Sequence, residues 1–377
     1  MNPGNFDFNQ RPFLVIWETT HACDLECIHC RASAEPDPDP DELTHEEGLR
    51  LIREVKDMGT PILIFSGGDP LKRKDLCELI RYAKSLGLRT GAIPAVTPLL
   101  TRGKIRELKE TGLDQIAFSL DAANAQDHDA FRKVEGVFKR TLESIAIAKE
   151  LGLAVQINSL VNVHNSGQLD ALIALIEPLG IVFWEVFFLV PTGRGKELPL
   201  LTAQKFDEAF EKIYQLSQRV RAIIKVTEAP HYRKFYIEKE LEKQGISTDS
   251  LVQEEVDMPA FLTQACGPKG SIGNAPLGVN SGKGFVFVSH LGEVFPSGFL
   301  PLLAGNLRER SLADIYRNSP LMKELRDPSL LKGRCGLCPY RGICGGSRSR
   351  AYALRGDYLE EDDGCSYQPA RGTAKTS

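Results

Sequence analysis

The sequence predicts an α/β protein: a partial (β/α)6 barrel followed by a cysteine-rich C-terminal extension. Short apolar runs alternate with amphipathic helical stretches from Phe13 to about Glu228, and dense Gly, Pro and Ser punctuation follows Cys266. Strands separated by helices in this rhythm form a parallel sheet of βα units. Six units are visible, two fewer than in a closed eight-stranded barrel, so we expect the barrel to stay open.

The expected helix ends follow ordinary local rules. Thr44 and Glu47 form a capping box before the first helix, and Gly87, Gly112 and Gly152 each stop a helical pattern. The six expected strands cover Phe13–Trp17, Ile62–Phe65, Leu88–Ile93, Gln115–Leu120, Ala154–Leu160 and Ile181–Val190.

Further elements are expected beyond the sixth strand. Residues 202–217 should form a helix and residues 223–226 a short strand. The charged stretch 234–253 is helical in character, and it is either a lid or bridge or a solvated surface helix. Residues 284–295 are typical of a β-hairpin, and residues 312–326 of a helix that Pro320 interrupts.

These elements suggest three domains. We place the barrel at residues 13–230, a helical bridge or lid at residues 231–262, and the cysteine-rich extension at residues 263–377.

Composition narrows the class of protein. The chain of 377 residues carries a net charge of −4, which gives no basic surface for nucleic acid. No apolar run is long enough to span a membrane, and residues 1–10 lack the apolar core of a secretion signal, so we expect a cytoplasmic protein. Nine cysteines are many for such a protein, and clustered cysteines in that setting indicate metal ligands rather than disulfides.

The most informative run is CDLECIHC at residues 23–30, directly after the first expected strand. Its cysteines, Cys23, Cys27 and Cys30, can hold three corners of a four-iron cube, which takes four cysteines when fully held. One iron then keeps an open position for chemistry. The alternatives are inert core cysteines and a zinc knuckle with His29, although zinc sites prefer paired C-x2-C units and His29 adjoins Cys30.

A second loop is expected at the same end of the sheet, where parallel α/β proteins bind ligands. The second strand runs into the turn Ser66, Gly67, Gly68, Asp69 and Pro70, whose two glycines let backbone groups approach a ligand closely. The turn alone is a weak signal. Because it should face the cysteine loop, it indicates a cofactor pocket.

These residues resemble those of the radical S-adenosylmethionine (SAM) enzymes. The resemblance covers about residues 13–228 and rests on the three cysteines, the βα units and the Gly67–Pro70 turn, in which Asp69 replaces the family's usual Glu. It implies that the open iron chelates the amino and carboxylate groups of SAM, with the Gly67–Gly68 turn binding the amino group. It further implies that one electron splits the sulfonium S–C5′ bond and that the 5′-deoxyadenosyl radical removes a hydrogen atom from a substrate. A reducing partner such as a flavodoxin or ferredoxin would supply the electron.

The same resemblance implies other cofactor contacts. Ser119 and Asp121, at the end of the fourth strand, would face the ribose or the methionine carboxylate, and Asn158 would bind the ribose. Ile28 and His29 would adjoin the adenine. Strand-end capping is the plain alternative for Ser119 and Asp121.

The C-terminal part holds a second cysteine set, Cys335, Cys338, Cys344 and Cys365, spaced C-x2-C-x5-C-x20-C. Four thiolates can close a cluster completely, although four cysteines also suit structural zinc. The set resembles the auxiliary-cluster extension of radical SAM enzymes called SPASM, whose full form holds two clusters.

Two departures from the full SPASM pattern reduce the expected cluster count. Ser297 and Arg348 stand where the full extension has cysteines, so we predict one auxiliary [4Fe–4S] cluster beside the SAM-binding [4Fe–4S] cluster. Cys266 is then left over: a relic of the lost site, a substrate-facing thiol or, most simply, a packed small residue. Cys77 is expected in a helix core.

The residues around Cys344 point to one group within the radical SAM enzymes. One group of radical SAM enzymes trims carboxyalkyl side chains of iron tetrapyrroles in siroheme-dependent heme synthesis. This sequence resembles that group in residues 344–353 and 356–357, and also on either side of the first cysteine loop, in residues 17–23 and 30–33. This implies hydrogen abstraction from such a side chain, loss of carbon dioxide or of the side chain, and electron transfer to the auxiliary cluster.

Four arginines are candidates for pairing with carboxylates. They are Arg31, Arg194, Arg348 and Arg350, and Arg194 is also a candidate contact of the cofactor. A solvated surface arginine is the plain alternative for each.

Two other functions stay open. Many SPASM enzymes modify ribosomally made peptides, and they often carry a leader-binding wing before the first strand, where this sequence has about a dozen residues. A non-catalytic iron–sulfur electron carrier belongs to a different class, and it has no need of a Gly67–Gly68 turn opposite an open iron.

Overall fold

The computed structural model describes residues 6–245, 272, 275–276 and 278–369. Their centre is one eleven-stranded sheet in the order β11-β10-β9-β1-β2-β3-β4-β5-β6-β7, with β8 beside β9. Within these residues β7 and β11 form the two open edges, so the barrel is partial, as predicted. The parallel strands of the barrel are β1 (Leu14–Glu18), β2 (Ile62–Ser66), β3 (Arg89–Ala92), β4 (Gln115–Ser119), β5 (Ala154–Val161), β6 (Phe183–Phe188) and β7 (Ile223–Thr227).

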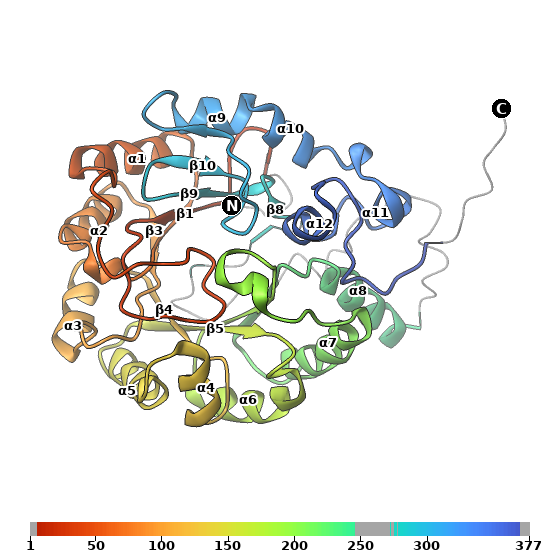
Figure 1. The fold of residues 1–377 in the computed structure, drawn as a ribbon, viewed down its shortest axis with the longest axis horizontal. Helices are drawn as coiled ribbons and strands as arrows, with labels where there is room; N and C mark the ends of the chain where they lie inside the picture. The colour runs from red at the N-terminus through yellow and green to blue at the C-terminus, as the bar shows by residue number, and fades with distance from the viewer. Residues whose placement is uncertain (1–5, 246–271, 273–274, 277, 370–377) are drawn as a thin grey trace.

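Helices cover the outside of this curved sheet (Figure 1). The predicted capping box is present: the Thr44 hydroxyl accepts from the Glu47 N–H, and the Glu47 carboxylate accepts from the Thr44 N–H. The three predicted stops, Gly87, Gly112 and Gly152, have φ of +77°, +88° and +70°, which favour glycine. The helices are α1 (His45–Asp57), α2 (Leu76–Ser85), α3 (Arg102–Glu110), α4 (Ala125–Arg132), α5 (Val137–Glu150), α6 (Leu169–Ile176) and α7 (Ala203–Ser217).

Side chains alternate between the two faces of the sheet. On β1, Val15 and Trp17 are fully buried toward the helices, where Trp17 packs on Phe65 with ring centroids 6.1 Å apart. Leu14 and Ile16 face the inside of the barrel and line a cavity there. The strand period of two therefore builds a helix-covered core on one side and a hollow on the other.

The predicted hairpin is present, but its position in the sheet was not predicted. It consists of β9 (Gly284–Val288) and β10 (Glu293–Phe295), flanked by β8 (Asn280–Ser281) and β11 (Gly305–Asn306). β9 pairs with β1 in parallel, with Leu14 opposite Phe285. The strands of the extension thus continue the barrel sheet, while the domain limits given above stay a prediction.

The remaining helices lie around the C-terminal part. The helix expected over residues 234–253 is α8 (Tyr232–Lys243), and residues 246–253 lie outside the described residues. As predicted, Pro320 separates α9 (Leu312–Asn318) from α10 (Pro320–Arg326). α11 (Gly333–Leu337) and α12 (Arg348–Arg355) follow.

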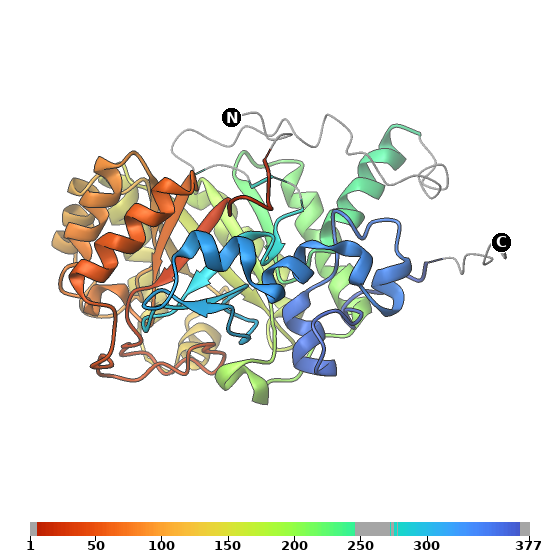
Figure 2. The same cartoon turned by 90° about the horizontal axis from the view of Figure 1, so that it is seen from above.

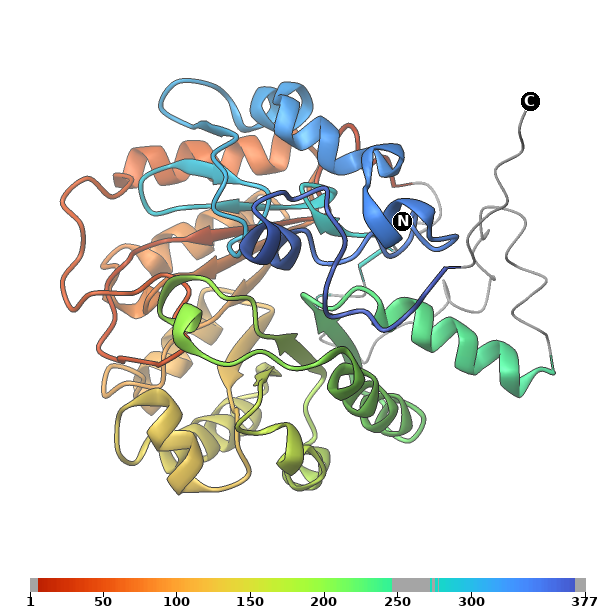
Figure 3. The same cartoon turned by 45° about the vertical axis from the view of Figure 1, so that its right-hand side comes forward.

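The two cysteine sets line two different pockets that share no lining residue. Figure 2 shows α1 to α3 at one end and α8 and the C-terminal segment at the other. Figure 3 shows that segment beside α8, where the Tyr340 hydroxyl donates to Glu238 at 3.1 Å. In the described part of the chain, none of the helices combines the length and apolar character needed to cross a bilayer.

Candidate active site

The first cysteine loop lies against the glycine turn that follows β2. The Gly68 N–H donates to the carbonyl oxygen of Thr20 at 2.9 Å, and the Asp69 N–H donates to that of Ala22 at 2.6 Å. A Cβ added to Gly68 would lie 2.4 Å from the Ala22 oxygen and 2.5 Å from the His21 oxygen. Only a glycine therefore allows the two loops to meet this closely.

One cavity collects most of the residues that the sequence singled out. Cys23, Cys27 and Cys30 all line it, beside the inward-facing Ile16 and Phe285. The other predicted residues on its wall are His29, Ser66, Gly67, Gly68, Ser119, Asp121 and Asn158. Ile28, Asp69, Pro70 and Arg194 are not among the lining residues.

Asp69 fixes the turn rather than facing this cavity. Its fully buried carboxylate accepts hydrogen bonds from the N–H groups of Leu71 and Ala95, at 3.1 and 3.3 Å, and from the Thr97 hydroxyl at 3.0 Å. Burial raises the pKa of Asp69 to about 6. Pro70 begins the short 3-10 helix Pro70–Lys72 that this carboxylate caps.

Arg194 holds the cysteine loop by its backbone. The guanidinium donates to the carbonyl oxygens of Cys27 at 3.0 Å and Ala34 at 3.3 Å, and the Arg194 N–H donates to that of Cys30 at 3.0 Å. The adjacent Gly193 has φ +51°, and a Cβ there would lie 2.3 Å from the Arg31 oxygen. The pairing of Arg194 with a carboxylate stays a prediction, and the structure adds this role in shaping the loop.

Arg132 is a site residue that sequence reasoning missed. Its Nε donates to Asp121 Oδ2 at 2.9 Å, and its Nη1 donates to the Sγ of Cys27 at 3.6 Å. Burial alone would raise the pKa of Asp121, but the Arg132 charge, the neighbouring His29 and His128 and the hydrogen bond from the Leu160 N–H together outweigh burial and lower that pKa. No sequence signal marked this residue, because only the fold brings the end of α4 to the cysteine loop.

His29 and Ile28 pack on the end of α4. The His29 ring stacks on Phe131 with centroids 4.3 Å apart and planes 9° apart, and the Ile28 N–H donates to the Phe131 oxygen at 3.1 Å. Burial lowers the pKa of His29 to about 3, so its ring is neutral. Ile28 packs against Phe131, Leu160 and Leu189 instead of lining the cavity.

The cysteines fit an iron–sulfur cluster better than a single ion. Tetrahedral zinc with Zn–S bonds of about 2.3 Å would bring its sulfur ligands to about 3.8 Å from one another. Among the described residues, no three cysteine sulfurs lie within 4.8 Å of one another. Burial raises the pKa of Cys23 to about 12, so this thiol stays protonated until a metal displaces the proton.

Comparisons with known proteins agree with this geometry. The family model described as the radical SAM superfamily matches residues 17–175. An AdoMet-dependent heme synthase of Methanosarcina barkeri is 39% identical over 360 residues, which cover 96% of this chain and 98% of that protein. The chain belongs to the radical SAM superfamily. It is therefore an enzyme that binds SAM and a [4Fe–4S] cluster, and the electron-carrier alternative is wrong.

Two further similarities extend the comparison. An Fe-coproporphyrin III synthase of Methanosarcina barkeri is 30% identical over 374 residues, covering 96% of this chain and 89% of that protein. In fold, the chain is similar to Streptococcus suis SuiB bound to the precursor peptide SuiA, with a TM-score of 0.71 and 16% identity over 95% of this chain and 76% of that chain. The predicted family and its heme-synthase group are confirmed.

In this radical SAM enzyme the second cysteine set also surrounds one pocket. Cys335, Cys338, Cys344 and Cys365 line it together with Lys234, Arg334 and Arg341. The Gly346 N–H donates to Cys344 Sγ at 3.4 Å, and Arg348 donates to Cys335 Sγ at 3.7 Å. These donors and cations offset the negative charge that four thiolates would bring.

Ser297, one of the two residues that stand in place of SPASM cysteines, belongs to a hydrogen-bond network around Glu228. Ser297, Ser347 and Ser349 all donate to the buried carboxylate of Glu228, with Ser297 at 3.2 Å and Ser349 at 3.1 Å. Burial raises the pKa of Glu228. The leftover Cys266 lies outside the described residues, and Cys77 packs against the core from α2.

The structure corrects two of the four arginine candidates. Arg348 is buried and donates to the carbonyl oxygens of Tyr358 and Glu360, each at 2.7 Å. Arg350 is buried and donates to the Glu228 carbonyl oxygen. Internal partners occupy both guanidinium groups, so neither is available to a substrate carboxylate.

Of the four arginines, Arg31 lines the cavity that also holds Cys23, Cys27 and Cys30, which is called the cofactor cavity below. It pairs with Glu18 at 2.7 Å and lies over the Phe287 ring at 4.4 Å. Its position leaves it a candidate for contact with an anionic ligand.

Proposed function

We propose that this enzyme carries out oxidative decarboxylation of carboxyalkyl side chains on an iron tetrapyrrole, in heme-type biosynthesis. When SAM is bound and the cluster is reduced, SAM supplies a 5′-deoxyadenosyl radical that can take one hydrogen atom from such a side chain. Loss of carbon dioxide and one electron then converts a propionate into a vinyl group.

The observation that carries this proposal is a second cavity that continues the cofactor cavity into the barrel. The two cavities share Ile16, Ile93, Phe187, Phe285 and Phe299. The deeper cavity is lined mainly by apolar side chains such as Ile62 and Ile64. A flat apolar macrocycle suits this hollow, because its ring can be desolvated against these side chains while an edge carboxylate stays near the cofactor.

Polar side chains gather on one wall of the deeper cavity. Glu185 accepts from Lys225 at 3.0 Å and from Gln156 at 3.0 Å, and Gln156 also donates to Asn158 on the cofactor wall at 2.6 Å. This hydrogen-bonded wall would orient the other edge groups of the macrocycle. The 39% and 30% identical relatives, whose names refer to heme and Fe-coproporphyrin III, support the same substrate class.

We further propose that Cys335, Cys338, Cys344 and Cys365 hold one auxiliary [4Fe–4S] cluster that accepts the electron left by decarboxylation. Two observations support it: the four cysteines share one pocket, and the cationic side chains of Lys234, Arg334 and Arg341 line that pocket with them. A flavodoxin or ferredoxin is the proposed reductant of the first cluster.

The deciding experiment is a turnover assay with defined tetrapyrroles. The anaerobically reconstituted enzyme is given dithionite, SAM and either iron-coproporphyrin III or siroheme-derived substrates. We expect 5′-deoxyadenosine, carbon dioxide and a product lacking one carbon dioxide and two hydrogens per side chain. A substrate deuterated at the carbon that loses hydrogen should transfer deuterium to 5′-deoxyadenosine. Stimulation by none of the tetrapyrroles would count against the proposal and favour a peptide substrate.

A cavity-filling variant tests where the macrocycle binds. Ala117 lines the deeper cavity and not the cofactor cavity, so Ala117→Leu should raise KM for the tetrapyrrole. Overpacking of this kind costs about 1–3 kcal/mol. Substrate-free SAM cleavage by the same variant is the internal control and should stay near the wild-type rate. An unchanged KM would place the macrocycle elsewhere.

A further inference from the structure

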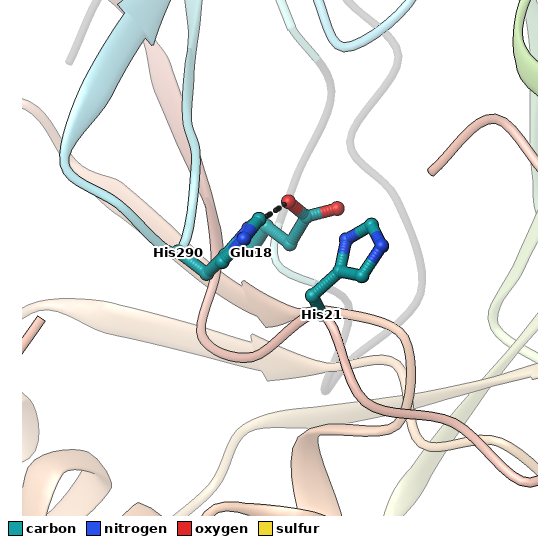
Figure 4. A group of neighbouring side chains, drawn as sticks. All are labelled: Glu18, His21 and His290. Carbon is teal, nitrogen blue, oxygen red and sulfur yellow. Dashed lines mark hydrogen bonds and ion pairs between the residues drawn. The ribbon is translucent and has the colours of Figure 1, made fainter. Parts of the chain in front are cut away.

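Glu18, His21 and His290 bring one carboxylate and two imidazoles together outside the cofactor cavity (Figure 4). One ligand atom from each lies within 4.8 Å of the other two. Glu18 ends β1, His21 begins the cysteine loop, and His290 lies in the turn of the β9–β10 hairpin. We propose that these three residues form a binding site for one divalent first-row metal ion, separate from both cysteine sets.

The spacing of the donors suits a single ion. Glu18 Oε2 lies 2.9 Å from His290 Nδ1. Ligand bonds of about 2.0–2.2 Å place neighbouring ligand atoms roughly 2.8–3.6 Å apart around an ion, the shorter values in octahedral and the longer in tetrahedral geometry. The His21 ring lies beside that of His290, with centroids 4.8 Å apart, and one of its nitrogens lies within 4.8 Å of the other two ligand atoms.

His21 carries an unused donor or acceptor at this point. Its Nδ1 is buried and has no hydrogen-bond partner among the described residues. A buried polar atom without a partner costs about 1–3 kcal/mol. A metal ion, or water bound to that ion, would remove this cost.

Hydrogen bonds hold the Glu18 carboxylate and the backbone of both histidines in place. Arg31 donates to Glu18 Oε1 at 2.7 Å, which orients the carboxylate and leaves Oε2 for the imidazoles. The His21 N–H donates to Glu42 at 2.8 Å, and the Leu43 N–H donates to the His290 carbonyl oxygen at 2.7 Å. A ligating carboxylate that is itself hydrogen-bonded, as Glu18 is by Arg31, is usual in metal sites.

The donor set selects the class of metal. Two imidazoles and one carboxylate favour Fe²⁺, Zn²⁺ or Mn²⁺ over Mg²⁺ and Ca²⁺, which prefer oxygen ligands. Both imidazoles are partly exposed, so water reaches the remaining coordination positions. The bound ion joins the cysteine loop to the hairpin, two segments about 270 residues apart in the sequence.

Equilibrium dialysis against zinc tests the site. The anaerobically reconstituted holoenzyme is dialysed against micromolar Zn²⁺, and zinc, iron and sulfide are then measured per chain. We expect about one retained zinc with iron and sulfide unchanged. His290→Asn and Glu18→Gln should each weaken retention by at least about tenfold.

His45→Asn is the matched control, because His45 also pairs with carboxylates, Asp75 at 2.8 Å and Glu78 at 3.9 Å, without a second imidazole. This variant should retain zinc like the wild type. Absence of retained zinc in the wild type would overturn the proposal. Equal retention by a correctly folded His290→Asn variant, or zinc uptake matched by loss of cluster iron, would overturn it as well.

Discussion

The guanidinium of Arg132 donates a hydrogen bond to the Sγ of Cys27 at 3.6 Å. The same guanidinium forms a buried ion pair with Asp121. A positive charge beside a cluster ligand stabilises the more negative, reduced state of that cluster. Arg132 therefore links the end of β4 to the ease with which the first cluster takes up its electron.

Removing this charge should make the first cluster harder to reduce. We expect Arg132→Met to lower its midpoint potential by on the order of 60 mV, which is about tenfold in a one-electron equilibrium. An EPR-monitored redox titration measures the shift. Arg102→Met is the control, because Arg102 forms an exposed ion pair with Glu150 and lines neither cysteine pocket. Identical potentials in Arg132→Met and wild type would refute the electrostatic role.

Gly68→Ala should disable the cofactor site by steric overlap. The new Cβ would lie 2.4 Å from the Ala22 oxygen, so the cysteine loop and the glycine turn must separate. A displacement near 1 Å typically costs about 100-fold in rate. Formation of 5′-deoxyadenosine under reducing conditions measures the loss.

Gly103→Ala is the control for that substitution. Gly103 lies in α3, and its added Cβ would come no nearer than 3.7 Å to Thr101 Oγ1. This variant should keep wild-type cleavage and gain up to about 1 kcal/mol of helix stability. Equal activity of the two variants would show that the close approach at Gly68 is dispensable.

The buried carboxyl of Asp69 should make stability depend on pH. Burial raises its folded-state pKa to about 6, above the ordinary value of 3.8. Its stabilising contribution is therefore complete below about pH 4 and is lost as the pH rises through 6. This shift in pKa corresponds to a change of about 3 kcal/mol in the free energy of unfolding.

Asp69→Asn removes this titration. Relative to wild type, the variant's melting temperature should therefore rise between pH 5 and pH 7, whatever the constant cost of the amide. Differential scanning fluorimetry of both proteins across this range checks the sign. A difference in melting temperature that is independent of pH would contradict the assignment.

Substitutions in the two cysteine sets should affect different steps of the reaction. Cys30→Ala should abolish SAM cleavage, whereas Cys365→Ala should retain some cleavage and lose substrate turnover. Iron analysis should fall from about eight to about four atoms per chain in Cys365→Ala. Equal loss of cleavage in both variants would contradict the proposed division of roles.

Local sequence patterns predicted local structure well. The capping box at Thr44 and the stops at Gly87, Gly112 and Gly152 depend on a few neighbouring residues, and the structure contains all of them. The cysteines, the glycine turn and the strand ends converge on one cavity because parallel strands bring their carboxyl ends to one edge of the sheet.

Features that depend on long-range packing could not be predicted from the sequence. Arg132 meets Cys27 only because α4 ends beside the cysteine loop, and no spacing rule encodes that meeting. Asp69 follows the two glycines that line the cavity, yet its side chain points into the core and accepts three hydrogen bonds. Arg348 resembles a surface arginine in sequence, but carbonyl oxygens of its own domain bind it in the interior.

The parallel pairing of Leu14 with Phe285 also sets an order of events during synthesis. One edge of β1 has no partner until residues 284–288 have left the ribosome, when most of the chain is complete. Unpaired strand edges invite wrong pairing, and here the edge lies beside three free cysteines. The first cysteine loop therefore stays beside an open sheet edge until the last quarter of the chain has been synthesised.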